Sequence, residues 1–341
     1  DQADRVTLTS RAFHNDQFGP VCKLLCEMTG FDKALLMNSG AEAVETAIKM
    51  ARKWGYTEKG VAKDQAEIIV FSNNFHGRTT TIVGFSTDAQ YQEGFGPFTP
   101  GFKVVPYGDA EAAEKAITGN TVAMLVEPIQ GEAGIIIPPE GYLKRLAAIG
   151  KERTVLLIAD EIQSGLGRTG KLLACEHEGV RPDVLVVGKA LSGGGYPVSA
   201  ALADDSVMSV FRPGDHGSTF GGNPLGCAVA KAALEVIRDE KLVENSATMG
   251  AYLQAELAKL PMDNIEDIRG RGLWIGLEIK KSSGSARPYC EALQESGILA
   301  KETHDQVIRI APPLVITKEE IDWAIPKIRE AIAVNRAAVQ V

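Results

Sequence analysis

The sequence predicts an α/β protein with a large domain built on a parallel β-sheet and a smaller α+β domain at its carboxyl end. Short apolar runs alternate with helical patterns over the first two-thirds of the chain, which is typical of a parallel sheet. The runs are apolar on consecutive residues, as expected for strands that helices cover on both faces. Past residue 227 the order of elements changes, so we expect domains over 1–227 and 228–341. An α+β mixture is the alternative.

Four strands are predicted in the large domain from short runs rich in Val, Ile and Leu. They cover 67–72, 122–128, 154–160 and 183–189. Amphipathic patterns around these runs predict helices over 41–54, 109–117 and 140–152. A longer helix over 224–239 begins with a proline, a residue favoured at the first helical position.

The smaller domain is predicted to begin with a helix over 247–259 and a strand over 272–280. A helix over 288–297, a strand over 307–315 and a helix over 318–335 follow. Pro326 lies inside the last helix, where a proline removes a backbone hydrogen bond and is expected to kink the helix.

The composition argues against two classes of partner. The 341 residues carry a net charge of −8, whereas a nucleic-acid-binding protein is expected to present a basic stripe. No apolar run approaches the roughly 20 residues that span a bilayer, so we expect no membrane partner. The five cysteines show no zinc-finger spacing. We therefore expect free thiols and a cytoplasmic location, or the mitochondrial matrix in a eukaryote.

Distinctive polar residues follow the predicted strands. They are Glu127, Asp160 with Gln163, Lys189 and the run 73–79. Open α/β sheets bind ligands at the carboxyl ends of their strands. A single polar residue in such a place only marks the end of a strand, but a set that includes a lysine indicates a binding site.

Lys189 follows the apolar run Val184–Val187 and precedes three glycines that allow close approach of a ligand. A partly desolvated lysine loses its proton more easily and becomes a nucleophile towards carbonyl groups, including in a Schiff base. The pattern indicates a reactive lysine, and a surface lysine that ends the strand is the alternative.

Asp160 ends the preceding strand. A carboxylate at this position is a metal ligand, a base or the partner of a cationic nitrogen. No histidine or carboxylate cluster accompanies it, which disfavours a metal.

Asn38, Ser39 and Gly40 precede the predicted helix over 41–54. A helix N-terminus with a neighbouring glycine suits a phosphate group, because its first N–H groups have no partner inside the helix. An ordinary capped helix is the alternative.

The segment GLGRTG, residues 165–170, matches the glycine spacing of a dinucleotide-binding loop. That loop must directly follow a strand and open a helix. Here Asp160 to Ser164 separate the strand from the first glycine, and KLLACEHEG is a poor helix start. We therefore predict a flexible loop that binds no nicotinamide cofactor.

Eight segments in this order resemble the class III pyridoxal 5'-phosphate (PLP)-dependent aminotransferases of fold type I: NSGAEAVETAIKMARKWGY, FHGRT, GFGPFTPGF, VEPIQGEAG, IADEIQSGLGRTG, GKALSGGGYPVSA, HGSTFGGNPLGCAVA and IRIAPPLV. The resemblance covers nearly the whole chain. It implies a large PLP-binding domain with a mixed, mostly parallel sheet covered by helices, and a smaller α+β domain. Family members carry an amino-terminal segment that shapes part of the substrate pocket. We expect that segment to be absent before Asp1.

By this resemblance, Lys189 binds PLP through a Schiff base and later moves protons. Asp160 pairs with the pyridinium nitrogen, so that the ring acts as an electron sink. Gln163 contacts the ring hydroxyl, and Phe75 stacks on the ring face.

The resemblance also implies a phosphate site shared between subunits. Gly40 and Ala41 offer backbone N–H groups to the phosphate. Ser218 and Thr219 reach the phosphate of the neighbouring subunit, so we expect a homodimer with shared active sites.

Three further residues resemble substrate-binding residues of the family. Arg78 corresponds to the arginine that contacts the α-carboxylate of ornithine, and Arg309 to the one that binds 2-oxoglutarate or glutamate. Glu132 corresponds to the glutamate that masks that arginine while the diamine is bound. A movable ion pair allows one pocket to accept an amine in one half-reaction and a dicarboxylate in the other.

The segments GEAG, YPVSA and APPLVI are most similar to the members of the family that act on ornithine. We therefore expect transfer of the δ-amino group of L-ornithine to 2-oxoglutarate, giving glutamate 5-semialdehyde and glutamate by a ping-pong route. His76 weakens this similarity, because FHGRT is common in acetylornithine enzymes. The alternatives are an acetylornithine or other ω-amino acid aminotransferase (GABA or lysine type), a racemase or decarboxylase of this fold, and a nicotinamide dehydrogenase.

Overall fold

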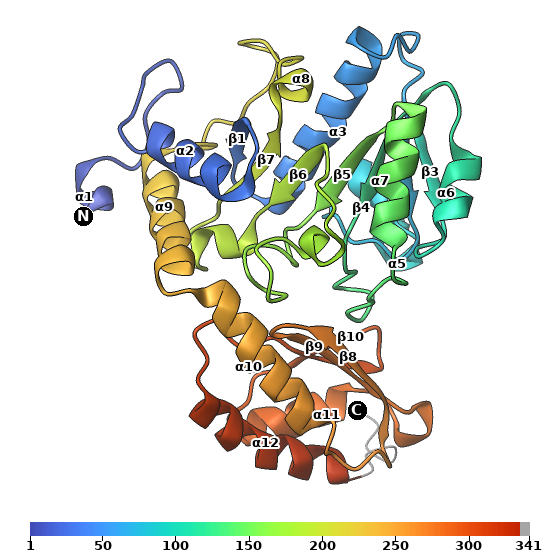
Figure 1. The fold of residues 1–341 in the computed structure, drawn as a ribbon, viewed down its shortest axis with the longest axis vertical. Helices are drawn as coiled ribbons and strands as arrows, with labels where there is room; N and C mark the ends of the chain where they lie inside the picture. Colours follow the sequence, from blue (N-terminus) through green and yellow to red (C-terminus); the bar gives the residue numbers. More distant parts are fainter. Residues whose placement is uncertain (335–341) are drawn as a thin grey trace. The chain divides into compact units, whose positions relative to one another are not determined.

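The computed structural model describes residues 1–334, which form two compact units (Figure 1). Unit 1 contains residues 1–128, 138–166 and 174–238. Unit 2 contains residues 129–137, 167–173 and the chain from 239 onward. No helix among the described residues is long and apolar enough to cross a membrane.

Unit 1 is built on a seven-stranded sheet with the order β1-β7-β6-β5-β4-β2-β3. The strands from β6 to β3 are parallel to one another, whereas β7 is antiparallel to both β6 and β1. The sheet is therefore mixed and mostly parallel, which confirms the predicted fold class. The bounds are β1 Lys33–Met37, β2 Glu67–Phe71, β3 Phe102–Val105, β4 Thr121–Val126, β5 Leu156–Asp160, β6 Val184–Val187 and β7 Ser199–Ala203.

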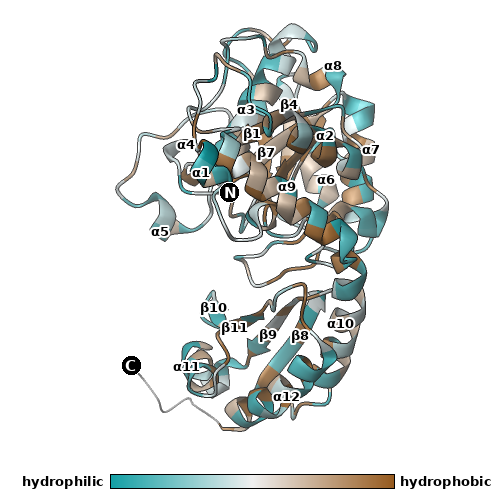
Figure 2. Ribbon diagram, turned by 90° about the vertical axis from the view of Figure 1, so that its left-hand side faces the viewer, coloured by the Kyte–Doolittle hydropathy of each residue, from teal (hydrophilic) through white to brown (hydrophobic). Residues whose placement is uncertain are grey.

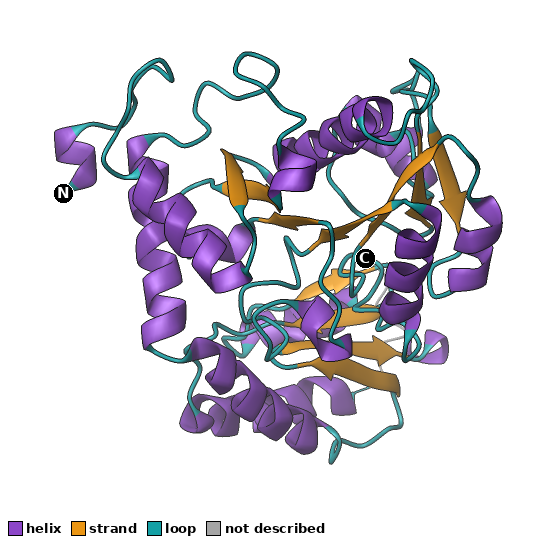
Figure 3. Cartoon of the chain, turned by 45° about the horizontal axis from the view of Figure 1, so that its top comes forward, coloured by secondary structure: helices purple, strands orange, loops and turns teal. Residues whose placement is uncertain are grey.

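Both faces of this sheet are covered, which explains why the central strands are apolar at every residue (Figures 2 and 3). Along β2, Ile68 and Val70 pack in the core on the side of α3 (Gly40–Thr57). The alternate residues Ile69 and Phe71 pack in the core formed with α7 (Tyr142–Arg153). Successive side chains of a strand point to opposite faces, so each face requires its own apolar set.

The remaining helices of unit 1 are short or lie at the edges of the sheet. The long helix α9 agrees with the prediction over 224–239, and α6 with the prediction over 109–117. Their bounds are α1 Gln2–Arg5, α2 Phe18–Thr29, α4 Thr80–Val83, α5 Ala89–Gln92, α6 Ala110–Ala116, α8 Asp205–Met208 and α9 Pro224–Asp239, with 3₁₀ turns η1 Ala174–Glu178 and η2 Lys189–Ser192.

Unit 2 contains a four-stranded antiparallel sheet with the order β10-β11-β9-β8. Three helices pack against it and enclose a separate apolar core. The bounds are α10 Leu242–Leu257, β8 Ile265–Arg271, β9 Trp274–Ile279, η3 Lys281–Ser283, α11 Arg287–Glu295, β10 Lys301–Thr303, β11 Val307–Ile310 and α12 Lys318–Ala333.

Several sequence predictions are adjusted by the structure. The strand predicted over 307–315 ends at Ile310, because the following Pro312 and Pro313 have no N–H to donate. The helix predicted from 247 begins at Leu242. The helix predicted over 318–335 ends at Ala333, and Asn335 lies outside the described residues.

The GLGRTG segment is a series of turns in which no helix begins, as predicted. Leu166, Gly167 and Gly170 have positive φ angles of 54°, 96° and 81°. Such a backbone does not form the strand–turn–helix that a dinucleotide requires.

Candidate active site

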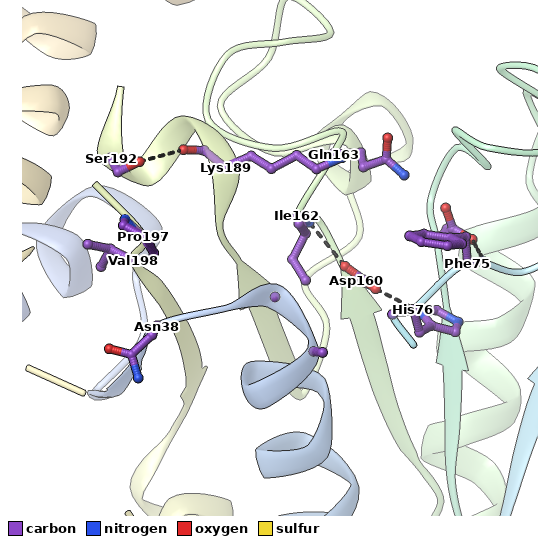
Figure 4. Close-up of a pocket in the computed structure, with 14 residues that line it drawn as sticks. Asn38, Phe75, His76, Asp160, Ile162, Gln163, Lys189, Ser192, Pro197 and Val198 are labelled. Atoms are coloured by element: carbon purple, nitrogen blue, oxygen red, sulfur yellow. Dashed lines mark hydrogen bonds and ion pairs between the residues drawn. The ribbon is translucent and has the colours of Figure 1, made fainter. Parts of the chain in front are cut away.

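A cavity of about 250 Å³ opens at the carboxyl edge of the unit 1 sheet (Figure 4). Asp160 ends β5, and Lys189 follows β6 by two residues. Because these strands are parallel and adjacent, their carboxyl ends meet at one edge. The lining residues are Asn38, Gly40, Ala41, Phe75, His76, Gly77, Glu127, Asp160, Ile162, Gln163, Lys189, Ser192, Pro197 and Val198.

The carboxylate of Asp160 is buried and held in a fixed orientation. Its Oδ2 lies 2.7 Å from Nδ1 of His76, and its Oδ1 accepts a hydrogen bond from the N–H of Ile162 at 3.1 Å. Asp160 and His76 are 4% and 3% exposed. A carboxylate oxygen accepts more than one hydrogen bond, so Asp160 retains capacity for a cationic N–H in the cavity.

The imidazole of His76 is the buried partner of the Asp160 carboxylate. Burial lowers the pKa of His76, but the hydrogen bond and negative charge of Asp160, together with Glu127, outweigh it and raise the pKa above its usual value. Its Nε2 is buried with no hydrogen-bond partner among the described residues. The one side-chain hydrogen bond that His76 makes among the described residues is therefore to Asp160, and it orients that carboxylate.

Lys189 begins the turn η2, and its side chain extends towards Gln163 (Figure 4). Its φ is +43°, a left-handed conformation that is uncommon for residues other than glycine. The backbone oxygen of Lys189 accepts a hydrogen bond from Ser192 Oγ at 3.2 Å. Such strained residues cluster at functional sites, where the surrounding structure holds them.

The N-terminus of α3 forms another wall of the cavity. Ser39 caps the helix in a capping box with Glu42, and Gly40 and Ala41 are the first two helical residues. Their N–H groups have no acceptor inside the helix and favour an anion. A Cβ atom at position 40 would lie 2.8 Å from Cδ1 of Ile162, so a larger residue there would require the Ile162 side chain to move.

Phe75 and Glu127 form a further wall of the cavity, and they connect the segments that follow β2 and β4. The N–H of Phe75 donates to the carboxylate of Glu127 at 2.8 Å, which fixes the backbone that carries the aromatic ring. Gly77 lies against Ala41, because a Cβ atom there would be 2.8 Å from Cβ of Ala41. The segment around Phe75 is thus packed onto the start of α3.

Ser218 and Thr219 do not line this cavity. Ser218 Oγ accepts from Asn38 Nδ2 at 2.9 Å and donates to Glu42 Oε1 at 3.1 Å. Thr219 is exposed and lines a different cavity, together with Arg11. The structure therefore places Ser218 beside the cap of α3 and Thr219 away from Lys189.

His216, which lies two residues before Ser218, holds this segment against α3. Its Nδ1 lies 2.8 Å from the ammonium of Lys49, and its Nε2 lies 2.8 Å from the hydroxyl of Thr46. An ammonium only donates, so Nδ1 is unprotonated and Nε2–H donates to Thr46. Burial lowers the pKa of His216, and the positive charges of Lys49 and Arg11 lower it further.

We expect the free energy of unfolding to fall at acidic pH because of His216. Its folded pKa lies below its usual value, so its contribution is present above about pH 6.5 and is lost as pH falls through the folded pKa. The unfolding midpoint should fall more between pH 7.5 and 5.5 for the wild type than for His216→Asn, which cannot titrate. The exposed His14→Asn serves as control, and parallel curves for all three proteins would contradict the prediction.

Arg78 lies outside the set of cavity-lining residues but beside it in the chain. Its guanidinium carbon lies 4.4 Å from the ring centre of Tyr91 and 5.8 Å from that of Phe75. Arg78 is thus held next to a ring that lines the cavity.

Glu132 and Arg309 both belong to unit 2 and form an ion pair. Arg309 Nη1 donates to Glu132 Oε1 at 2.7 Å, and the side chains are 19% and 16% exposed for Glu132 and Arg309. Arg309 lies in β11, and the hydroxyl of Thr303 in β10 donates to the backbone oxygen of Glu132. The pair is thus charge-assisted and partly shielded from water.

The sequence predicted no contact between His76 and Asp160 and no role for the side chain of Ile162, whereas Asn38, which was predicted to precede the helix N-terminus, does line the cavity. His76 follows Phe75 directly, but its contact with Asp160 arises from a loop that returns to a different strand. Among the described residues, no group of three or more His, Cys, Asp or Glu residues could hold a metal ion.

The fold and the site define an aminotransferase. Residues 1–332 match the family model described as aminotransferase class-III, and the chain belongs to this family. The predicted resemblance is thereby confirmed.

Several relatives share more than half of their residues with the chain. The ornithine aminotransferase of Bacillus subtilis (strain 168) is 58% identical over 97% of this chain and 82% of its own length. That of Bordetella pertussis (strain Tohama I) is 56% identical over 98% of this chain and 81% of its own length.

Solved structures give the same fold. The ornithine aminotransferase of Toxoplasma gondii ME49 has a TM-score of 0.95 at 48% identity, with 97% of this chain and 80% of that chain covered. A second structure of the Toxoplasma gondii enzyme, with a TM-score of 0.95 at 47% identity and coverage of 99% and 80%, has partial occupancy of PLP at its active site. The acetylornithine aminotransferase of Elizabethkingia anophelis has a TM-score of 0.88 at 53% identity, with coverage of 97% and 83%.

Proposed function

We propose that this protein is a PLP-dependent ornithine δ-aminotransferase, which transfers the δ-amino group of L-ornithine to 2-oxoglutarate and yields glutamate 5-semialdehyde and glutamate. The observation that carries the proposal is the single cavity shared by Lys189, the buried Asp160 and the N-terminus of α3. The identity of 56–59% to ornithine aminotransferases supports the substrate.

The residues present fit PLP. Asp160 offers a buried, oriented carboxylate to a cationic ring nitrogen. Gly40 lets the start of α3 lie close to Ile162, because a Cβ atom at position 40 would contact that side chain. The N–H groups of Gly40 and Ala41 suit a phosphate. The aromatic plane of Phe75 suits a flat ring, and Gln163 offers an amide to a ring hydroxyl.

Each of these side chains has a separate task in the reaction. When bound, PLP would supply an electron sink for the bonding electrons of the reacting carbon and a carbonyl group that carries the amino group between the two substrates. Lys189 Nζ binds the cofactor and then carries a proton to and from the reacting carbon. Asp160 keeps a proton on the ring nitrogen, and Phe75 covers one ring face and excludes water.

Two arginines are proposed to select the substrates. Arg78 binds the α-carboxylate of ornithine. Arg309 binds a carboxylate of glutamate or 2-oxoglutarate after Glu132 has released it, and Glu132 neutralises Arg309 while an amine is bound. An arginine that is neutralised in one half-reaction and released in the other suits two substrates of opposite terminal charge.

The proposal is tested by a substrate panel of ornithine, N-acetylornithine, 4-aminobutanoate and lysine. We expect the largest kcat/KM for ornithine. N-acetylornithine is the second candidate, since the chain is 53% identical to an acetylornithine aminotransferase and carries the FHGRT segment. A larger kcat/KM for N-acetylornithine would replace ornithine with this second candidate.

Within this panel, we expect Glu132→Gln to lower kcat/KM for ornithine by about ten-fold and to leave that for 2-oxoglutarate unchanged or higher. The loss corresponds to one charged hydrogen bond, of about 1.5 kcal/mol, and leaves Arg309 positive when the amine enters. Glu278→Gln is the matched control, because Glu278 pairs with Arg269 in the same unit. An equal loss in both half-reactions would contradict a masking role for Glu132.

The proposal includes the assembly, the domains and the location. Ser218 and Thr219 do not line the cavity of their own chain, which supports the proposal that they contact the cofactor phosphate of a partner subunit in a homodimer. We assign the large PLP-binding domain to 1–227 and the small domain to 228–341, a boundary that falls inside α9, whereas the compact units divide at Asp239 and unit 2 also includes 129–137 and 167–173. All five cysteines are free thiols, which supports a cytoplasmic location.

A further inference from the structure

Two aromatic rings form a shelf beneath the guanidinium of Arg78. Tyr91 and Phe75 meet edge to face, with ring centres 5.9 Å apart. The guanidinium carbon lies closer to Tyr91, at 4.4 Å, than to Phe75, at 5.8 Å. Both distances are within the range of a cation–π interaction. Tyr91 therefore provides the main contact to Arg78, and we call the two rings the aromatic shelf.

The aromatic shelf holds the charge of Arg78 without using its donors. Among the described residues, the guanidinium has no hydrogen bond or ion pair, and the side chain is exposed. A ring attracts the face of the guanidinium and leaves the five N–H groups at its edge available. Arg309 is held differently, since Glu132 occupies one of its N–H groups and offsets its charge.

The position of Tyr91 is itself fixed by local structure. Tyr91 lies in the short helix α5, which Asp88 caps by accepting the N–H of Gln90 at 2.9 Å. Gln92 Nε2 donates to the backbone oxygen of Ser86 at 2.7 Å and ties the helix to the preceding turn. These contacts hold the backbone that carries Tyr91, and the tyrosine ring itself is half-buried against Phe75.

We propose that Tyr91 is a positioning residue that keeps Arg78 oriented and unpaired for the carboxylate of the amine substrate. The inference rests on the proposed function, in which Arg78 binds that carboxylate. The two arginines would then differ in how they become available: Arg78 can bind a carboxylate directly, whereas Arg309 can do so only after its ion pair with Glu132 has broken. Tyr91 should thus act on one half-reaction and not on the other.

The test compares Tyr91→Leu, which removes the ring, with Tyr91→Phe, which keeps it. In Tyr91→Leu we expect KM for ornithine to rise about two- to five-fold, the range of an exposed cation–π contact. The kcat and the KM for 2-oxoglutarate should not change. Tyr91→Phe should restore the wild-type KM. Butane-1,4-diamine, which lacks a carboxylate, should show the same KM in all three proteins.

An equilibrium measurement separates binding from turnover. Calorimetry with pentanoate, an unreactive carboxylate, should give weaker binding to the Tyr91→Leu holoenzyme and unchanged binding to Tyr91→Phe. Tyr91→Met is a second ringless variant if the leucine variant does not fold, and unchanged thermal midpoints exclude a general loss of structure.

The outcomes distinguish this inference from the proposed function. If Arg78→Gln leaves the KM for ornithine unchanged, the carboxylate role of Arg78 is wrong and the Tyr91 inference is overturned with it. If Arg78→Gln raises that KM but both ringless variants keep the wild-type value, only the Tyr91 inference is overturned. An equal rise in KM for butane-1,4-diamine would also overturn it, because that amine has no carboxylate to position.

Discussion

Lys189→Ala is expected to abolish covalent attachment of the cofactor and to lower kcat by at least about 10³-fold. Lys189 Nζ is the nucleophile and the proton carrier in the proposed reaction, and proton transfer alone contributes about 10²- to 10⁴-fold. The wild type should absorb near the edge of the visible range, and borohydride should bleach this absorption and fix the cofactor to the protein. The variant should show neither the absorption nor the fixed adduct.

A matched control separates this effect from the loss of any lysine. Lys151 is exposed on α7, and Lys151→Ala should keep the absorption, the adduct and the activity. A borohydride-stable adduct on Lys189→Ala, located on another lysine by mass spectrometry, would show that the reactive lysine has been assigned wrongly.

Asp160→Asn is expected to lower kcat by about 10²-fold or more while the cofactor stays attached to Lys189. The loss has the size found when a preorganised polar group is removed from an active site. An asparagine still accepts the N–H of Ile162 and faces His76 with an amide, so the fold should persist and the thermal midpoint should change little.

The same variant should lower the pKa of His76. Burial lowers this pKa, and the carboxylate of Asp160 is the main group that raises it. The ring protons of His76, followed by NMR, should therefore titrate at lower pH in Asp160→Asn than in the wild type. Asp183→Asn is the control, because Asp183 accepts the N–H of Leu157 at the other end of these strands. Equal losses of kcat in both variants would contradict a special role for Asp160.

Much of the unit 1 sheet could be predicted because its central strands are covered on both faces. A strand such as β4 is buried at every residue, and a run of consecutive apolar residues is the direct result. Strand β7 escaped prediction because its residues, SAALA, are small and lack the branched side chains that favour strands. Strand β8 escaped because most of its residues are polar and exposed or half-buried.

The residues at strand ends were predictable for a geometric reason. Parallel strands bring their carboxyl ends to one edge, so Asp160, Gln163 and Lys189 line one cavity although the first and the last are 29 positions apart in the sequence. The contact of His76 with Asp160 was not predictable, since it depends on where a loop after β2 meets β5. The contact of Arg78 with Tyr91 likewise depends on how two short turns fold onto each other.

Glu42 links two parts of unit 1 that lie far apart in the sequence. Its carboxylate caps α3 by accepting the N–H of Ser39 at 2.8 Å, and it also accepts the hydroxyl of Ser218 at 3.1 Å. The phosphate proposed to bind at the start of α3 should therefore reduce the entropy that the segment around Ser218 must still lose, and ordering of that segment should favour the phosphate to the same extent. Reciprocal coupling of this kind needs no change of shape, and Asn38 adds a second link, because its Nδ2 donates to Ser218 Oγ at 2.9 Å.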